Sequence, residues 1–225
     1  MRLTRLSLYR GEPEPKRFHH ALQLRGDDSL QAAIANIGPN GGSVRLAPDG
    51  WTLGESITIS SPVTLIGSGR STVVSADAAA SSPLIDITSS AGVTIRGIKF
   101  VSTASSPAIA IRISADSVRI VDCTFSGFTT AIRVVSGKQR WRIDGCDISG
   151  QSGQAIDVNG ARAGAVINNV VSAIDGYDEM EFDSASAGCV IIGNIIDGGS
   201  IKVTGASGHV VGTTNTLNAA TVTVV

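Results

Sequence analysis

The chain has 225 residues, of which 42% are hydrophobic, 16% charged and 4% aromatic, and its formal net charge is −1. This length suits one domain whose core needs no disulfide or metal. Nucleic-acid binders usually show a clustered basic face, which this charge does not predict. No apolar run approaches the roughly 20 residues that a membrane-spanning helix requires. We therefore expect neither a nucleic-acid partner nor membrane insertion.

Residues 1–26 differ from the rest of the chain. They hold Pro13, Pro15 and the adjacent His19 and His20, together with much of the basic charge. They contain neither the continuous apolar segment nor the small-residue cleavage site of a secretory signal. We predict an extended arm over 1–26 that serves attachment or contact between subunits, without a signal peptide, and a single domain over 27–225.

A short amphipathic helix is predicted at the start of that domain, with Asp28 as its N-cap and Gly38-Pro39 as its end. Its apolar face comprises Leu30, Ala33, Ile34 and Ile37. Such a helix can cover the open end of the structure that follows.

A recurring phrase dominates the remaining sequence. It begins at Val63, Val93, Val118, Trp141, Ala165, Cys189 and His209, at spacings of 30, 25, 23, 24, 24 and 20 residues. Repeats of this length indicate structural units stacked on one another.

A second phrase of alternating apolar and polar residues keeps step with the first. It occupies residues 85–87, 111–113, 132–134, 156–158, 180–182, 201–203 and 222–224. A period of two indicates half-buried strands, so every repeat carries at least two short strands. Stacking like strands in parallel, about 4.8 Å apart, predicts an all-β parallel β-helix with one short capping helix.

The first repeats also resemble a known superfamily. Asp27-Asp-Ser-Leu-Gln-Ala-Ala-Ile, Gly41-Gly-Ser-Val-Arg-Leu-Ala-Pro and Val63-Thr-Leu-Ile-Gly-Ser-Gly are similar to the first turns of the pectate-lyase-like, right-handed β-helix proteins. That superfamily includes polysaccharide lyases, glycoside hydrolases and the tailspikes and fibres of bacteriophages. The resemblance implies a right-handed coil and covers residues 27–215, but it does not select a function.

An acidic cluster supplies the candidate catalytic residues. Carboxylates stand at Asp175, Asp178, Glu179, Glu181 and Asp183. Two carboxylates about 5–9.5 Å apart can act as acid and base in glycoside hydrolysis, and several can hold a hard cation. We expect Glu179, Glu181 and Asp183 to point outward, an arrangement that any alternating surface strand also gives.

Candidate ligand-binding residues form a second group, Arg119, Arg142, Asp144 and Asp147, with Asp122 beside them. The lyases of the superfamily that the chain resembles combine calcium-binding carboxylates with a basic side chain on one sheet. The alternating strands also predict a ladder of charges, in which 133 pairs with 157 and 181 with 202. No paired metal motif involves Cys123, Cys146 or Cys189, so we expect buried thiols, no metal and no cofactor.

The outward positions of the first strand family change from polar to apolar along the chain. One column reads Thr94, Arg119, Arg142, Val166, Val190, Val210, and two neighbouring columns end in Ile192 and in Val171 and Ile195. Soluble monomers rarely expose an apolar patch of a few hundred Å². We therefore predict an oligomer interface, with a homotrimer favoured, at Val166, Val171, Val190, Ile192, Ile195 and Val210.

These observations give two hypotheses for function. The first is a spike or tail-fibre subunit of a phage or phage-like particle, which binds a surface glycan or another virion protein for host attachment. It places the protein on a virion or extracellular particle, with the arm contacting a virion protein. The alternative is a polysaccharide depolymerase, either a lyase or a glycoside hydrolase.

Overall fold

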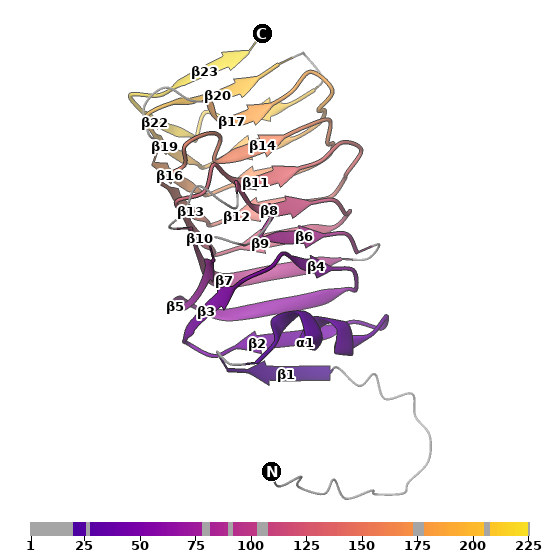
Figure 1. The fold of residues 1–225 in the computed structure, drawn as a ribbon. Helices are drawn as coiled ribbons and strands as arrows, with labels where there is room; N and C mark the ends of the chain where they lie inside the picture. The colour runs from indigo at the N-terminus through magenta and orange to yellow at the C-terminus, as the bar shows by residue number, and fades with distance from the viewer. Residues whose placement is uncertain are drawn as a thin grey trace, which may run out of the picture.

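The chain is a parallel β-helix in which the backbone winds upward from β1 and α1 to β23 (Figure 1). This computed structural model describes residues 20–25, 28–77, 82–89, 92–102, 108–172, 178–204 and 208–224. Its strands form two sheets whose neighbouring strands run parallel. The predicted fold is therefore confirmed. Most of the predicted arm lies outside the described residues, but His20–Leu24 already form strand β1 of the coil.

The smaller sheet, here called sheet B, contains the second phrase of each repeat. Its eight strands stack in chain order. They are β4 (Ile57–Ile59), β6 (Ile85–Ile87), β8 (Ile109–Ile113), β11 (Thr130–Val134), β14 (Ile156–Val158), β17 (Asp178–Phe182), β20 (Ser200–Val203) and β23 (Thr221–Val224).

The larger sheet, here called sheet A, has 15 strands and contains the first phrase. Its lower strands are β1 (His20–Leu24), β2 (Gly42–Leu46), β3 (Gly50–Leu53), β5 (Val63–Ala76) and β7 (Val93–Ser102). Above β7 each turn contributes two short strands separated by a corner. These are β9 (Val118–Val121), β10 (Thr124–Ser126), β12 (Arg142–Asp144), β13 (Asp147–Ser149), β15 (Ala165–Ile167), β16 (Val170–Ser172), β18 (Val190–Ile192), β19 (Ile195–Asp197), β21 (Val210–Val211) and β22 (Thr216–Asn218).

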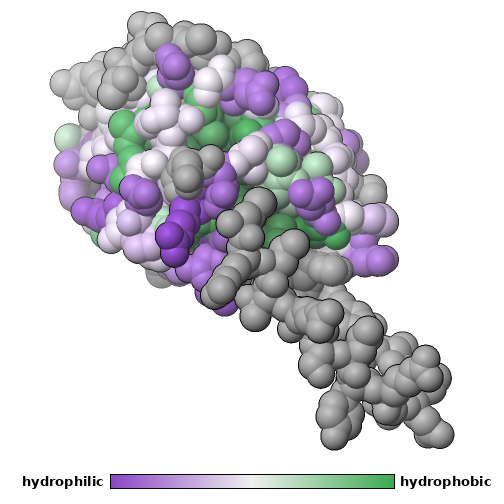
Figure 2. Space-filling model, turned by 60° about the horizontal axis from the view of Figure 1, so that its bottom comes forward, coloured by the Kyte–Doolittle hydropathy of each residue, from purple (hydrophilic) through white to green (hydrophobic). Residues whose placement is uncertain are grey.

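Helix α1 (Leu30–Ile37) packs on the lower end of the coil (Figure 1). Its four predicted apolar residues are buried, and Gly38 ends it as predicted. The predicted N-cap is wrong by one residue: Ser29 Oγ accepts from the Ala32 amide at 3.2 Å, whereas Asp28 accepts from the Arg25 amide. Seen from this end, apolar and hydrophilic residues share the surface (Figure 2). No helix in the described ranges is long and apolar enough to cross a membrane.

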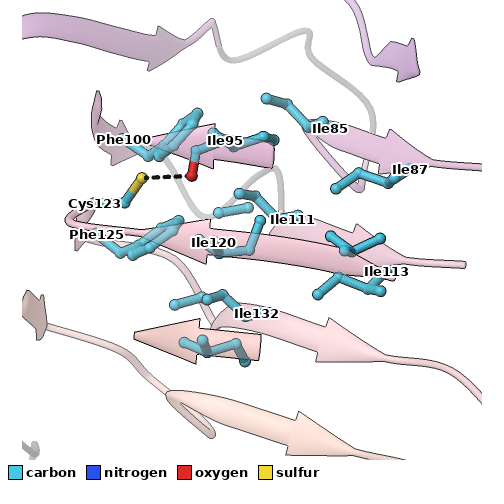
Figure 3. Close-up of a cluster of buried hydrophobic side chains, with 14 of the residues drawn as sticks. Ile85, Ile87, Ile95, Phe100, Ile111, Ile113, Ile120, Cys123, Phe125 and Ile132 are labelled. Carbon is cyan, nitrogen blue, oxygen red and sulfur yellow. Dashed lines mark hydrogen bonds between the residues drawn. The ribbon is translucent and has the colours of Figure 1, made fainter. Parts of the chain in front are cut away.

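Equivalent inward side chains stack in columns through the core (Figure 3). Phe100 and Phe125 stack with their ring centroids 5.1 Å apart, and Ile95 lies over Ile120 beside them. Cys123 and the equivalent Cys146 are buried free thiols, as predicted. Burial raises the pKa of Cys123 to about 12, so this thiol stays protonated.

The fifth repeat begins at Gly164, one residue earlier than the sequence pattern predicts. Arg142 pairs with Ala165, so Gly164 stands above Trp141 in the inward column. The buried Trp141 ring fills this space: a Cβ on Gly164 would lie 2.0 Å from a ring carbon. Glycine is therefore required where other repeats begin with a larger side chain, and the first apolar residue after it points outward.

Three asparagines, the buried Asn169 and Asn194 and the half-buried Asn215, continue the cysteine column upward and form a hydrogen-bonded ladder. Asn169 donates its backbone and side-chain N–H groups to Asn194 Oδ1 at 3.0 and 2.9 Å. Asn194 repeats both contacts with Asn215 Oδ1 at 2.9 and 3.0 Å. The cysteine column was predicted, whereas the ladder above it was not.

The corner of sheet A alternates between glycine and a short polar residue. Gly97, Asp122, Gly145, Asn168 and Gly193 all have positive φ, between 51° and 68°. Asp122 Oδ1 would lie 2.7 Å from a Cβ on Gly145, and Asn168 Oδ1 2.5 Å from one on Gly193. Each Asp or Asn side chain therefore occupies the space that the glycine above leaves free.

Candidate functional site

The outer face of sheet A brings the predicted ligand-binding residues together. Arg119 and Arg142 are neighbours in register on β9 and β12, and both are exposed. Arg142 folds back onto Asp144 two residues along, with Nη2 2.7 Å from Oδ2. Asp144 therefore already has a basic partner, while no described residue forms an ion pair with Arg119.

Arg70 completes a hollow on this face that the sequence pattern did not predict. It projects from an excursion within β5, whose register with β7 shifts between Ile66 and Val73. Arg70 Nη2 lies 2.6 Å from Asp147 Oδ2, although Asp147 belongs to β13. The hollow has a volume of about 250 Å³. It is lined by Arg70, Lys99, Thr124, Ser126, Asp147 and Ser149.

The excursion that carries Arg70 is fixed at its base. The buried Thr72 hydroxyl accepts from the Ser68 amide at 2.9 Å and donates to the Ala47 carbonyl at 3.0 Å. A Cβ on Gly67 would lie 2.3 Å from the Gly97 carbonyl oxygen, so the chain can leave the sheet closely only with glycine there. The Arg70 side chain itself is 75% exposed. An exposed ion pair contributes about 0.2–1 kcal/mol, so a ligand can displace it from Asp147.

Cations outnumber carboxylates on this part of the face, which we call the charged half. Besides the paired Arg70 and Arg142, it carries Arg96, Lys99 and Arg119 in outward positions of β7 and β9. Its carboxylates are Asp144, Asp147 and, at the corner, Asp122. Within the described ranges, no ion pair involves Arg96, Lys99 or Arg119.

The face becomes apolar from the fifth repeat upward, as predicted, but with different residues. Val166 and Val171 were predicted to point outward and are fully buried, because the fifth repeat starts one residue earlier than expected. The outward residues, here called the apolar half, are Ala165, Ile167, Val170, Val190, Ile192, Ile195 and Val210. The exposed fractions are 39% for Val170, 41% for Ile195 and 56% for Val210.

The structure gives the candidate catalytic carboxylates separate environments. Glu181 points outward and is held by Lys202 and by Gln154, each at 3.0 Å. Asp183 Oδ1 accepts from Gly160 N and from the Ser186 amide and hydroxyl at 2.8–3.0 Å, so it closes a turn. The side chain of Asp178 and all of Asp175 lie outside the described residues.

Glu179 was predicted to point outward and is fully buried. It lies at a register irregularity of β17, immediately before Met180. Residues in the same position of lower turns are Ala110, Ala131 and Ala155, all buried. Among the residues that the structure describes, neither carboxylate oxygen of Glu179 has a hydrogen-bond partner, and burial raises its pKa to about 7.

The remaining observations for this region concern the charge pairs, His209 and metal-binding side chains. Arg133 and Asp157 pair at 2.7 Å and Lys202 and Glu181 at 3.0 Å, which confirms the predicted ladder on sheet B. His209 is half-buried against the Phe182 ring, with centroids 5.7 Å apart. No group of three metal-binding side chains occurs among the described residues.

Comparisons with known proteins identify the fold. No family model and no curated protein sequence matches the chain. Among solved structures, the catalytic domain of an α-1,3-glucanase in complex with nigerose aligns with a TM-score of 0.65 and 14% identity, over 96% of this chain and 47% of that one. This chain therefore spans about half the length of the structures that it matches first.

Pectin methylesterases align as well. One in complex with a hexasaccharide gives a TM-score of 0.53 at 15% identity, over 75% of this chain and 61% of that one. The enzyme from Aspergillus niger gives 0.52 at 13%, over 91% and 85%. These similarities confirm the parallel β-helix fold that the resemblance implied. At such identities they do not transfer a function.

Proposed function

We propose that this protein is a spike or fibre subunit of a phage or phage-like particle, and that it binds a surface glycan through the charged half of sheet A. The observation that carries the proposal is the hollow beneath Arg70. Thr124, Ser126 and Ser149 supply hydroxyls, and Arg70, Lys99 and Asp147 supply charged groups, within about 250 Å³. Such a mixture can donate to and accept from the hydroxyls of a sugar.

The side chains of the site lie on rigid strands, so a ligand would meet a preformed surface that need not change shape on binding. Thr124, Ser126 and Ser149 belong to the stacked strands β10 and β13. Because adjacent turns repeat the same backbone geometry, they present equivalent groups at a spacing of about 4.8 Å. A linear glycan can therefore contact several turns, and solenoid proteins use their extended surfaces in this way.

The apolar half supports the proposed assembly. Its Val and Ile side chains form three adjacent columns on one sheet, and Val170, Ile195 and Val210 among them are exposed. Such an apolar patch resembles the centre of a protein–protein interface. A second copy of this chain is the occupant that we propose, since it presents rows with the same vertical spacing. Association of three copies through the apolar halves, with the coils splayed away from the symmetry axis below the fifth repeat, would bury the apolar halves and leave the charged halves accessible.

Glycan binding is tested with purified bacterial surface polysaccharides, both neutral and acidic, immobilised for interferometry. We expect the parent chain to bind at least one of them, and Ser126→Trp to weaken that binding at least tenfold by filling the hollow. Ser172→Trp is the matched control, because Ser172 has the equivalent place two turns higher, and it should change binding less than twofold. Failure to bind any polysaccharide contradicts the proposal.

The particle assignment needs its own test. Mass spectrometry of purified particles from a producing culture should detect this chain in fixed proportion to the other structural proteins. Particles that are infectious and lack the chain would rule out a spike subunit. The proposed contact between residues 1–19 and a virion protein predicts that a chain truncated before His20 is missing from particles.

A polysaccharide depolymerase is the second candidate, favoured by Glu181, a carboxylate that points outward from sheet B beside Lys202 and Gln154. Glu179 is fully buried and cannot reach a substrate, so Glu181 is the residue to test. The expected signs are release of reducing ends or of unsaturated product, and at least a hundredfold loss in Glu181→Gln. Intact polymer after prolonged incubation at pH 5–8 excludes this candidate.

A further inference from the structure

We propose that Asn40 is a site of spontaneous deamidation, in which the backbone nitrogen of Gly41 displaces ammonia from the asparagine side chain. The chain contains this dipeptide twice, and the fold protects the second copy, Asn159–Gly160. Neither asparagine belongs to the charged or the apolar half of sheet A, so the reaction is independent of the proposed function.

The reaction joins two neighbours in the chain. The Gly41 nitrogen gives its proton to a base from the solvent and attacks Asn40 Cγ, so that an N–Cγ bond forms as the Cγ–Nδ2 bond breaks and ammonia leaves. Water then opens the cyclic imide at either carbonyl, which gives aspartate or an isoaspartate whose main chain runs through Cβ. The nitrogen must therefore be free to lose its proton and to approach Cγ. Glycine favours this approach because it has no side chain.

The Asn159 side chain is exposed, yet the glycine after it is held by the turn above. Gly160 is buried, and its nitrogen donates to Asp183 Oδ1 at 2.8 Å. A hydrogen bond to a carboxylate is roughly twice as strong as one between neutral groups. The same oxygen accepts from the Ser186 amide and hydroxyl, which fixes the Asp183 side chain. Loss of the Gly160 proton would place a negative nitrogen against this carboxylate, so the attack on Asn159 is suppressed.

Asn40 lies in the turn between α1 and β2, at the lower end of the coil (Figure 1). Its side chain is exposed like that of Asn159. Gly41 N donates to the neutral Gly38 carbonyl at 3.3 Å, which is longer than the roughly 2.7–3.2 Å of a normal N–H···O bond. A hollow of about 380 Å³ borders both Asn40 and Gly41, so there is room for the imide ring. The nitrogen that attacks is therefore held weakly here and strongly at the other site.

Deamidation changes both the charge and the backbone at this end of the coil. It replaces a neutral amide by a carboxylate in a hollow whose other side chains are uncharged, namely Ser43, Pro62, Val63 and Thr64. Isoaspartate also adds a methylene to the main chain just before Gly42, whose amide bonds to the Pro62 carbonyl where β2 begins to pair with β5. We therefore expect α1, which closes the coil, to be held less tightly in aged protein.

Peptide mapping by mass spectrometry measures both rates in the intact protein, incubated at pH 8 and 37 °C. Electron-transfer fragmentation distinguishes isoaspartate from aspartate. A sample unfolded in guanidinium chloride gives the rate that each dipeptide has without the fold. In the folded chain we expect Asn40 to react within fivefold of its unfolded rate, and Asn159 to react at least fiftyfold more slowly than its own unfolded rate.

Two variants identify the protecting contact. Asp183→Ala frees the Gly160 nitrogen and should raise the rate at Asn159 at least tenfold, with the rate at Asn40 unchanged. Ser186→Ala is the matched control, because it removes a hydroxyl from the same turn and leaves the bond between Gly160 and Asp183, so Asn159 should stay slow. Circular dichroism verifies that both variants fold.

Each outcome decides for or against the selective reaction. Protection of Asn40 as strong as that of Asn159, or rapid reaction at both, overturns the proposal. A folded Asp183→Ala protein in which Asn159 stays slow, or an equal acceleration in Ser186→Ala, overturns the protecting role of Asp183. Where Asp183→Ala does not fold, the folded and unfolded rates of the parent still decide whether the two sites differ.

Discussion

The charged and apolar halves of sheet A share one backbone and differ in almost every side chain. Arg119 and Arg142 precede Ala165 and Val190 in a single column, and Asp147 precedes Val170 and Ile195 in another. The same boundary divides the core, where Cys123 and Cys146 give way to the asparagine ladder. Stacked repeats are held by their neighbours, so each repeat can carry a different outer surface without a change of fold.

The largest expected effect comes from breaking the ladder that distinguishes the upper core. Asn194→Ala removes the acceptor for two Asn169 N–H groups and the donor to the Val166 carbonyl. Buried groups left without partners cost about 1–3 kcal/mol each, so we expect a loss of about 4 kcal/mol in the free energy of unfolding. Urea denaturation measures it. Asn218→Ala, an exposed change in the neighbouring turn, should cost less than about 0.5 kcal/mol.

A double-mutant cycle at Trp141 and Gly164 measures the energetic coupling where the charged half meets the apolar half. Gly164→Val should destabilise the chain by about 3 kcal/mol, since its Cβ meets the Trp141 ring. Trp141→Val opens a cavity that a valine at 164 can partly fill. We therefore expect the double variant to be more stable than the sum of the single effects by about 2 kcal/mol. Additive effects would contradict the stacking of these two positions.

Glu179 predicts a pH dependence that the alanines below it lack. Its pKa in the folded chain, about 7, is above the ordinary value of 4.5, so the folded state binds the proton more tightly. Its stabilising effect is full below pH 4.5 and is lost as the pH rises to 7. The difference in unfolding free energy between Glu179→Ala and the parent should therefore grow by up to about 3 kcal/mol from pH 4 to pH 8.

Denaturation across this pH range tests the prediction, with Glu55→Ala as an exposed control whose difference from the parent should stay flat. The charged groups nearest along the sheet, Glu181 and Lys202, pair with each other and remain in both proteins. A pH-independent difference for Glu179→Ala would show that its carboxyl is solvated in the folded state.

Much of the fold could be predicted from the sequence, because every stacked repeat contains the same alternation of apolar and polar residues. The strands and the sheet B ladder could be predicted from that period, and the capping helix from its apolar face and its end at Gly38-Pro39. The register above Trp141 could not, because the spacing leaves room for one residue either way and only the volume of the indole ring decides it. The asparagines at 169, 194 and 215 recur at repeat spacing, a signal that could have revealed the ladder.

The candidate site was only partly predictable. Alternation placed Arg119, Arg142, Asp144 and Asp147 on one face. Arg70 reaches Asp147 across 77 residues from an excursion that breaks the period, so no pattern linked them. Glu179 has the same alternation as Glu181, yet the equivalent position is buried in the four turns directly below, at Leu84, Ala110, Ala131 and Ala155.

The central claim is that the apolar half joins copies of this chain while the charged half stays free. Sedimentation velocity of the parent and of Val190→Asp/Ile195→Asp tests it most directly. The parent should sediment at three times the 23.0 kDa chain mass, and the variant at the mass of one chain with its far-ultraviolet circular dichroism retained. A parent that is already monomeric, or a folded variant with unchanged mass, would contradict the account.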